Sequence, residues 1–372
     1  MTNDAKVSMY SRKAGYHFGW DWGPRFVTSG IWRPVSISTW NTIVIDDLFI
    51  KQLSIVANDA KIQAQLSIRS KVEGVKTLKI FIDGSSIPLV SKEVLVQKGN
   101  NHIQVTFDMK NIELWWPNGM GNHKMYKFKT VLSDKGSELA VREAQRGIRT
   151  IEVVQESGQK GQSFAFKVNG KMVFMKGANY IPQDNFIPRI KRTQYEHVIQ
   201  TAVESNMNML RVWGGGFYEN DLFYDLCDEN GILIWHDFMF AFSLYPPTEK
   251  FKQSIYQEAK ENIIRLRNHP SIAMWCGNNE ITQFMNQDYW GFKSKWRTPE
   301  DSLETVATYD HIFHEILPAA MKAYDDEKFY WSSSPNTTNY SHDFPTQHLA
   351  GDLHFWGVCG MVRSSSRVLM II

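Results

Sequence analysis

The sequence predicts a multidomain protein in which an immunoglobulin-like β-sandwich is followed by an incomplete (β/α)8 TIM barrel. From about Asn41 to Arg149, short segments alternate apolar and polar residues, which is typical of an antiparallel sandwich. Beyond about Phe164, apolar strands alternate with helical stretches, which indicates a parallel sheet. With 372 residues, 43% of them hydrophobic, the chain can bury more than one core.

Residues 1–40 are rich in Gly, Trp and Arg and are too few to form a core of their own. Within them, Ile31 to Thr39 alternates apolar and polar residues like a terminal strand. In residues 41–150, turn signals such as Asp83-Gly84 and Asp134-Lys135-Gly136 separate the alternating segments. The strands predicted there are Leu48 to Val56, Lys61 to Arg69, Thr77 to Ile82, His102 to Phe107 and Tyr126 to Leu132.

Residues 151–358 are predicted to form the barrel, which has room for about six of its eight units. The absence of GxGxxG before the first helix favours a barrel over a dinucleotide-binding fold. The last residues, 359–372, have no cap or turn signal and are predicted to be an anomalous tail. The predicted strands are Met172 to Lys176, Met207 to Val212, Ile232 to His236, Ser271 to Cys276, Phe329 to Ser332 and Leu349 to His354. The predicted helices are Thr193 to Ser205, Asn220 to Asn230, Glu249 to Arg267 and Ser302 to Lys322.

Composition excludes several classes of partner. A formal net charge of +2 without a dense Lys/Arg run argues against nucleic acid, and no apolar stretch is long enough for a membrane span. The segment Met1 to Gly15 is polar, so we expect no signal peptide. The three cysteines are far apart, and His311-x-x-His314-Glu315 does not match HExxH, so we expect neither a metal nor another cofactor.

The run from Trp275 to Glu280 carries the strongest chemical signal. It places Asn279 and Glu280 after the apolar strand Ile272 to Trp275, where a barrel glycosidase holds its proton donor. A proton donor must keep its proton near neutral pH, which partial burial beneath Trp275 would favour. The alternative is structural: Asn279 caps the next helix and Glu280 interacts with the helix dipole.

A second polar cluster is expected at the same rim. Arg211 and Trp213 end the second strand, and the glycines at 214–216 let the backbone approach a ligand closely. A buried Arg211 would keep a carboxylate ionised and orient it. Asp237 ends the third strand and Asn179 follows the first, so both are candidate binding residues.

Several motifs in order resemble a β-mannosidase of glycoside hydrolase family 2, over about Ser11 to Val358. The most specific motifs are Gly19-Trp20-Asp21-Trp22-Gly23-Pro24, Gly30-Ile31-Trp32-Arg33-Pro34, Lys176-Gly177-Ala178-Asn179-Tyr180, Arg211-Val212-Trp213-Gly214 and Asn279-Glu280. The resemblance implies that residues 1–40 are the C-terminal remnant of a sugar-binding β-sandwich domain. It also implies retaining hydrolysis of terminal β-D-mannose from oligosaccharides. Oligomeric state stays open. Members of this family occur in lysosomes and in the bacterial periplasm or cytoplasm, so the location also stays open, and a bacterial periplasm or cytoplasm is our expectation.

The resemblance also implies roles for individual residues. Glu280 would be the acid/base, Asn279 the contact to the sugar 2-hydroxyl, and Arg211 the support of the nucleophile. Trp213 would form a wall of the −1 subsite. Trp20 and Asp21 would reach the pocket from the first domain, where the carboxylate would bind distal mannose hydroxyls. The alternative for Trp20 is a place in the sandwich core.

The chain departs from the family pattern near its end. The family nucleophile is a Glu on the seventh barrel strand, and no comparable Glu follows Val358. We therefore expect a fragment without normal turnover, because the retaining reaction needs that nucleophile. The competing hypotheses are a noncatalytic carbohydrate-binding remnant, and a β-galactosidase-like or β-glucuronidase-like exo-glycosidase of the same family.

Overall fold

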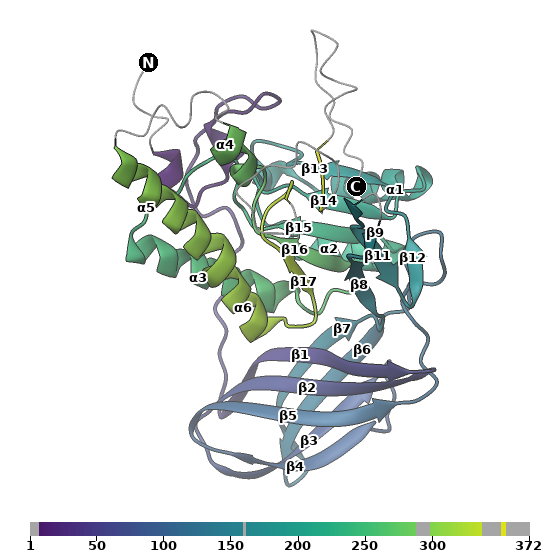
Figure 1. The fold of residues 1–372 in the computed structure, drawn as a ribbon. Coiled ribbons are helices and arrows are strands. Elements are labelled where there is room, and N and C mark those ends of the chain that lie inside the picture. Colours follow the sequence, from purple (N-terminus) through teal and green to yellow (C-terminus); the bar gives the residue numbers. More distant parts are fainter. Residues whose placement is uncertain (1–6, 159–160, 288–297, 337–350, 355–372) are drawn as a thin grey trace.

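The computed structural model describes residues 7–158, 161–287, 298–336 and 351–354. Here the chain forms an N-terminal segment without strands, a β-sandwich, and a parallel sheet with helices (Figure 1). The predicted fold class, a sandwich followed by an incomplete barrel, is confirmed. Among the helices of these ranges, none has the length and apolar character that crossing a membrane requires.

The β-sandwich consists of a three-stranded sheet, β1-β2-β5, and a four-stranded sheet, β4-β3-β6-β7. Alternate side chains of each strand point inward, as Ile62, Ala64 and Leu66 of β2 do, and together they form one apolar core. The strands are β1 (Ile43–Val56), β2 (Asp59–Ser70), β3 (Gly74–Ile82), β4 (Val90–Val96), β5 (Gly99–Met109), β6 (Tyr126–Asp134) and β7 (Ser137–Arg146).

Each of the five strands predicted in this region lies within an observed strand, but two strands were not predicted. Both missed strands, β4 and β7, are the edges of the four-stranded sheet. Edge strands bury few side chains and often carry charges. In β4 only the two terminal valines are buried, so its sequence shows no clear alternation. The predicted turn between β6 and β7 is confirmed, with positive φ at Lys135 (φ 47°) and at Gly136 (φ 86°).

The N-terminal segment lies along the barrel and contains two short 3-10 turns, η2 (Ser8–Tyr10) and η3 (Gly15–Phe18). The predicted strand from Ile31 to Thr39 is wrong, because these residues pair with no strand in the described part of the chain. Ile31 and Ile37 are 85% and 92% exposed. A strand needs a neighbour to bond its backbone, and an alternating sequence alone does not supply one.

Between the sandwich and the parallel sheet lies a small antiparallel sheet, β12-β11-β8. The prediction that Met172 to Lys176 is the first barrel strand is wrong. Asn169 and Gly170 both have positive φ and turn the chain back, so that β12 pairs with β11. The bounds are β8 (Ile151–Val154), β9 (Ser157–Gly158), β10 (Gly161–Gln162), β11 (Ala165–Val168) and β12 (Lys171–Val173).

The parallel sheet has the order β13-β14-β15-β16-β17, which follows the chain. One face packs on the antiparallel sheet, where Phe164 contacts Trp235 and Trp331 at centroid distances of 5.8 and 5.0 Å. The other face packs on the helices. The strands are β13 (Gly177–Tyr180), β14 (Met209–Val212), β15 (Leu233–Asp237), β16 (Ile272–Cys276) and β17 (Phe329–Trp331).

Helices connect these strands, and α3, α5 and α6 lie together on one side of the sheet (Figure 1). Gly231 ends α2 in the left-handed conformation. The stretch predicted as one helix from Ser302 to Lys322 contains a π-helical turn, η7 (His311–Ile316), just before Pro318, which lacks an N–H and cannot complete an α-helical ladder. The helices are η4 (Ile187–Arg189), α1 (Arg192–Glu204), α2 (Asp221–Asn230), α3 (Glu249–Leu266), α4 (Ile281–Gln287), α5 (Pro299–Asp310) and α6 (Leu317–Tyr324).

The sixth predicted strand, Leu349 to His354, lies partly outside the described residues. Its described part, 351–354, is not a strand, although Asp352 forms a single antiparallel bridge with Asn336. The predicted tail at 359–372 lies entirely outside them.

Gly177 allows the first two parallel strands to approach each other. A Cβ added at this position would lie 1.9 Å from the carbonyl oxygen of Met209, which is a backbone atom and cannot rotate away. We expect Gly177→Ala to lower the free energy of unfolding by about 1–3 kcal/mol, as overpacked sites do. Urea denaturation measures this loss. In Gly23→Ala the nearest contact would be 3.8 Å, so an equal loss in that control would contradict the explanation.

Candidate active site

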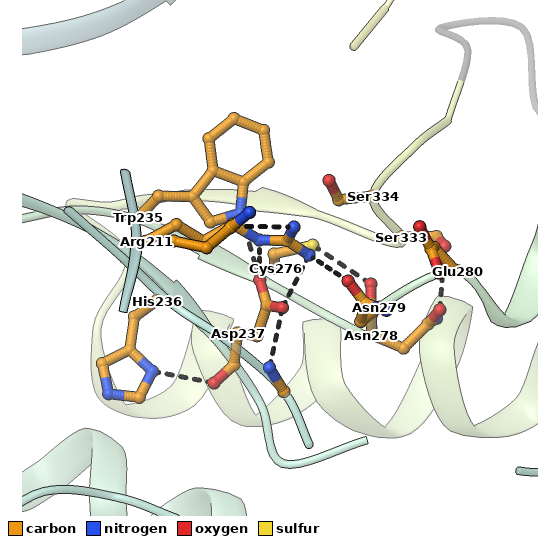
Figure 2. A network of polar contacts seen from close by, with 12 residues as sticks. Arg211, Trp235, His236, Asp237, Cys276, Asn278, Asn279, Glu280, Ser333 and Ser334 are labelled. Carbon is orange, nitrogen blue, oxygen red and sulfur yellow. Dashed lines mark hydrogen bonds and ion pairs between the residues drawn. The ribbon is translucent and has the colours of Figure 1, made fainter. Parts of the chain in front are cut away.

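Polar side chains converge at the carboxyl ends of the parallel strands (Figure 2). Asn179 lies on β13, Arg211 on β14 and Asp237 on β15, while Asn279 and Glu280 follow β16. The prediction that these residues share one rim is confirmed by the hydrogen bonds that join Arg211 to the other strands. This rim is where barrel enzymes carry their catalytic groups.

Arg211 and Asp237 form a buried ion pair with side-chain exposures of 1% and 0%. Arg211 donates from Nε and Nη2 to the two oxygens of Asp237, at 3.2 and 2.8 Å. The carboxylate also accepts the Gly214 N–H and the Trp235 Nε1–H. Burial alone would lower the pKa of Arg211, but the charge of Asp237 raises it. Burial raises the pKa of Asp237, and the charge and hydrogen bonds of Arg211 and the Gly214 N–H oppose this shift.

Arg211 also orients two amide side chains of the rim. Its Nη2 donates to Asn279 Oδ1 at 2.9 Å, and Nη1 lies 3.5 Å from Asn179 Oδ1. Arginine has only donors, so the oxygen of each amide faces the guanidinium. The NH2 group of Asn279 is therefore the end directed away from Arg211.

Glu280 is 5% exposed and has a positive φ of 60°, a conformation that is uncommon for a residue with a side chain. Backbone bonds hold this turn: Glu280 N–H donates to the Ser334 carbonyl at 2.8 Å, and Asn279 N–H donates to the Phe240 carbonyl at 2.9 Å. The structural alternative, in which Asn279 caps the next helix, names the wrong capping residue. Asn278, not Asn279, accepts the Ile281 N–H at the start of α4.

His354 completes the contacts of Glu280 and was not predicted as a site residue. Its Nδ1 lies 2.5 Å from Glu280 Oε1, and its Nε2 lies 3.2 Å from Arg211 Nη1. The sequence could have indicated His354, because it ends the sixth predicted strand and side chains at the carboxyl ends of barrel strands reach the rim.

The prediction that Trp275 covers Glu280 is wrong. Trp275 packs between the sheet and the helices, where its ring centroid is 4.7 Å from that of Phe238. The glycines at 214–216 lie close to other parts of the protein, and their approach to a ligand stays a prediction. A Cβ on Gly215 would lie 1.9 Å from the Trp213 ring, and one on Gly214 would lie 2.5 Å from the Phe240 carbonyl oxygen.

The tryptophans of the N-terminal segment pack on the barrel and not in the sandwich core. Trp20 makes an edge contact with Trp213 at 4.7 Å between centroids, and Trp22 makes one at 5.9 Å. The Tyr16 N–H, which donates to the Gly215 carbonyl, fixes this segment on the barrel. Asp21 lies between the two tryptophans in sequence and is exposed.

Arg12 anchors the same segment more deeply. It donates to both oxygens of Glu258 at 2.8 Å, and its guanidinium lies 3.9 Å from the centroid of Phe240. Phe240 in turn accepts the Asn279 N–H through its carbonyl. A cavity of about 840 Å³ lies beside Arg12, between residues 12–33 and the barrel, and neither Glu280 nor Arg211 lines it.

Among the described residues, three potential metal ligands lie close together between α2 and β16. Asp225, Asp228 and His269 converge, but Asp228 already accepts the Ser271 N–H and lies 2.6 Å from His269 Nδ1. These bonds tie α2 to the start of β16 and account for the cluster as a structural feature. At the zinc-like spacing, His311 Nδ1 lies 3.9 Å from Glu315 Oε2 on the same helix.

Matches to known families cover most of the chain. A galactose-binding domain-like model of glycosyl hydrolase 2 matches residues 2–33, a glycosyl hydrolases family 2 model matches 43–149, and the TIM barrel model of that family matches 161–295. The chain belongs to glycosyl hydrolases family 2. The resemblance seen in the sequence motifs is thereby confirmed at the level of the family.

Two curated relatives of this family 2 chain are named Beta-mannosidase B. Beta-mannosidase B of Aspergillus fumigatus is 37% identical over 347 residues, which are 93% of this chain and 41% of the relative. Beta-mannosidase B of Aspergillus niger is 36% identical over 357 residues, 96% of this chain and 42% of the relative. The chain thus spans about two fifths of the length of the curated relatives it matches.

Solved structures agree with the family. The beta-D-mannosidase of Dictyoglomus thermophilum is 38% identical with a TM-score of 0.84, covering 97% of this chain and 43% of its own. The exo-chitosanase of Amycolatopsis orientalis has a TM-score of 0.63 at 18% identity, covering 81% of this chain and 33% of its own. That second likeness shows the shared fold alone.

Proposed function

We propose that this chain carries the acid/base half of a β-mannosidase site that releases terminal non-reducing β-D-mannose with retention of configuration. The observation that carries the proposal is Glu280 at the barrel rim, buried and held beside Asn279 and Arg211. A carboxyl in such a site protonates the leaving oxygen and later activates water. Relatives named beta-mannosidase match almost the whole chain, which supports mannose as the sugar.

Asn279 and Asn179 are proposed to bind sugar hydroxyls. Because the Asn279 oxygen accepts from Arg211, its NH2 group is left to donate to the 2-hydroxyl of the sugar. A hydrogen bond there strengthens as charge develops at the anomeric carbon. Arg211 and Asp237 are paired with each other, and Arg211 contacts both amides, so we propose that this pair positions them.

Trp20 and Trp213 are proposed as apolar walls of the sugar subsite, with Asp21 binding the hydroxyls far from the scissile bond. The edge contact between the two indoles places Trp20 of the N-terminal segment against the barrel strand that carries Arg211. Sugar CH faces pack well on aromatic rings. The exposure of Asp21 leaves its carboxylate accessible to a ligand.

Retention requires a second carboxylate about 5 Å from the acid/base. Among the described residues, two other carboxylates belong to the network around Glu280, and both are engaged: Asp237 with Arg211, and Asp352 with Trp331 Nε1 and the Asn336 N–H. We therefore propose that the chain assayed alone shows no normal turnover. Activity is tested in an extended chain, in which these residues are joined to the part of a relative that they do not cover, such as that of Beta-mannosidase B of Aspergillus fumigatus.

The substrate assignment predicts the outcome of a panel of nitrophenyl glycosides. We expect the extended chain to hydrolyse the β-mannoside with the highest kcat/KM, because relatives named beta-mannosidase match 93% of this chain. Faster hydrolysis of the β-galactoside or β-glucuronide would move the assignment to a sister exo-glycosidase.

The competing hypothesis of a noncatalytic carbohydrate-binding protein is tested by calorimetry, which measures binding of mannose and mannobiose to the unextended chain. If the chain binds mannose but its extended form hydrolyses none of the glycosides, this second hypothesis is supported.

A further inference from the structure

A short segment from Phe238 to Ala241 holds the backbone of Asn279. The segment follows β15, and its Phe238 N–H donates to the Cys276 carbonyl at 2.7 Å. The Asn279 N–H donates to the Phe240 carbonyl at 2.9 Å, and Ala241 forms a parallel bridge with Asn279. The position of Asn279 at the rim therefore depends on where this segment lies.

Arg12 of the N-terminal segment contacts the same four residues. Its Nη2 donates to the Met239 carbonyl at 2.9 Å, and its guanidinium lies 3.9 Å from the centroid of the Phe240 ring. That ring is only 1% exposed, so the contact between the cation and the ring is shielded from water. Arg12 thus fixes the backbone at one residue of the segment and the side chain at the next.

Glu258 of α3 fixes the guanidinium of Arg12 in turn. Its two carboxylate oxygens accept from Nε and Nη2 of Arg12, both at 2.8 Å, and Oε1 also accepts the Tyr218 hydroxyl at 3.2 Å. The side chains of Arg12 and Glu258 are 15% and 21% exposed. A two-pronged pair of arginine and carboxylate has one preferred geometry, so the guanidinium is held in a single orientation toward Met239 and Phe240.

We propose that Arg12 is a positioning residue that holds Asn279 in place for its contact with the sugar 2-hydroxyl. Glu258 orients Arg12, and Arg12 fixes the segment that contains the Phe240 carbonyl. That carbonyl holds the backbone of Asn279, while Arg211 holds its side-chain oxygen. The inference rests on the proposed function, in which the Asn279 NH2 group binds the substrate.

Backbone NMR of the chain tests the coupling between Arg12 and Asn279. In the sequence, only Asn101 and Asn279 follow another asparagine. Labelling asparagine with ¹³C at the backbone carbonyl and ¹⁵N at the backbone nitrogen therefore leaves these two amides in a spectrum that correlates both nuclei. In Arg12→Met we expect the Asn279 N–H to exchange with solvent about 10- to 100-fold faster, the factor that a hydrogen bond to a charged group contributes. The Asn101 amide, in β5 of the sandwich, should keep its rate.

Two further variants separate this effect from damage to the fold. Arg33→Met is the matched control, because Arg33 lies in the same N-terminal segment but donates to the Tyr218 carbonyl, at 2.7 Å. Its Asn279 exchange rate should equal that of the wild type. The double variant Arg12→Met with Glu258→Gln removes the carboxylate that has lost its partner. In urea denaturation it should regain stability over Arg12→Met, while the fast exchange of Asn279 persists.

Kinetics of the extended chain provide the second readout. We expect Arg12→Met to lower kcat/KM for a nitrophenyl β-mannoside by about 10- to 100-fold, the effect of a small misplacement of a group that contacts the substrate. The 2-deoxy analogue lacks the hydroxyl that Asn279 is proposed to bind, so its kcat/KM should fall much less. A general loss of structure would lower both values by the same factor.

Three results would overturn the proposal: an unchanged Asn279 amide in Arg12→Met, equal changes in Arg12→Met and Arg33→Met, or equal kinetic losses on the two substrates. If the extended wild-type chain hydrolyses no β-mannoside, the proposed function fails. Faster exchange of Asn279 in Arg12→Met, with the Asn101 rate unchanged, would then leave the coupling between Arg12 and Asn279 intact.

Discussion

Replacing Glu280 by glutamine is expected to lower kcat of the extended chain for a β-mannoside with a poor leaving group by about 10²–10⁴-fold, the usual contribution of a positioned general acid or base. The substitution keeps the size of the side chain and its ability to contact His354. It removes the proton needed by the leaving oxygen. Steady-state kinetics with mannobiose measures the loss.

The leaving group and added nucleophiles distinguish a lost acid from a damaged fold. An activated nitrophenyl leaving group needs little protonation, so formation of the glycosyl-enzyme should be less affected than with mannobiose. Azide, which needs no general base, should restore turnover of that intermediate. Glu196→Gln, at a surface glutamate of α1 paired with Arg192, is the control. Equal losses in both variants, or no loss with mannobiose, would exclude Glu280 as the acid/base.

Arg211→Met is expected to lower the free energy of unfolding by about 3–5 kcal/mol, the cost of removing one partner of a buried ion pair. The variant would leave Asp237 fully buried without its two strongest donors. Urea denaturation of the chain measures the change. Arg189→Met is the matched control, because Arg189 also forms a two-pronged pair, with Asp184, but is itself 64% exposed.

The double variant Arg211→Met with Asp237→Leu tests the cause of that loss. If an uncompensated buried carboxylate is responsible, replacing both partners by apolar residues should recover much of the stability. Additive losses would attribute the effect to packing. A loss at Arg211 no larger than at Arg189 would contradict the assignment of a buried pair.

Much of the barrel could be predicted because its strands are buried on both faces. Every residue of β14, β15 and β16 is buried, and such strands appear as continuous apolar runs in the sequence. The polar residues that end these runs therefore stood out, and Arg211, Asp237 and Asn279 do meet in the structure. An apolar run in the sequence was enough to locate a strand wherever that strand is buried on both faces.

The wrong or missing predictions have physical causes that depend on residues distant in the sequence. The strand expected at Ile31 lacks a partner among the described residues, and β12 was assigned to the wrong sheet because the Asn169-Gly170 turn reverses the chain. His354 reaches Glu280 across 74 residues, a contact that depends on the closure of the sheet. Trp275 faces the helices because side chains alternate along β16, which no count of aromatic residues reveals.

The sandwich does more than separate domains. Arg149, just after β7, donates to the carbonyls of Pro270 and Ile272 at 3.0 and 2.7 Å, and Asn268 accepts the Ile50 N–H. These bonds hold the first residues of β16, the strand whose far end leads to Glu280. The sandwich therefore supports the start of that strand. A barrel moved onto another protein would have to keep these contacts between the sandwich and the start of β16.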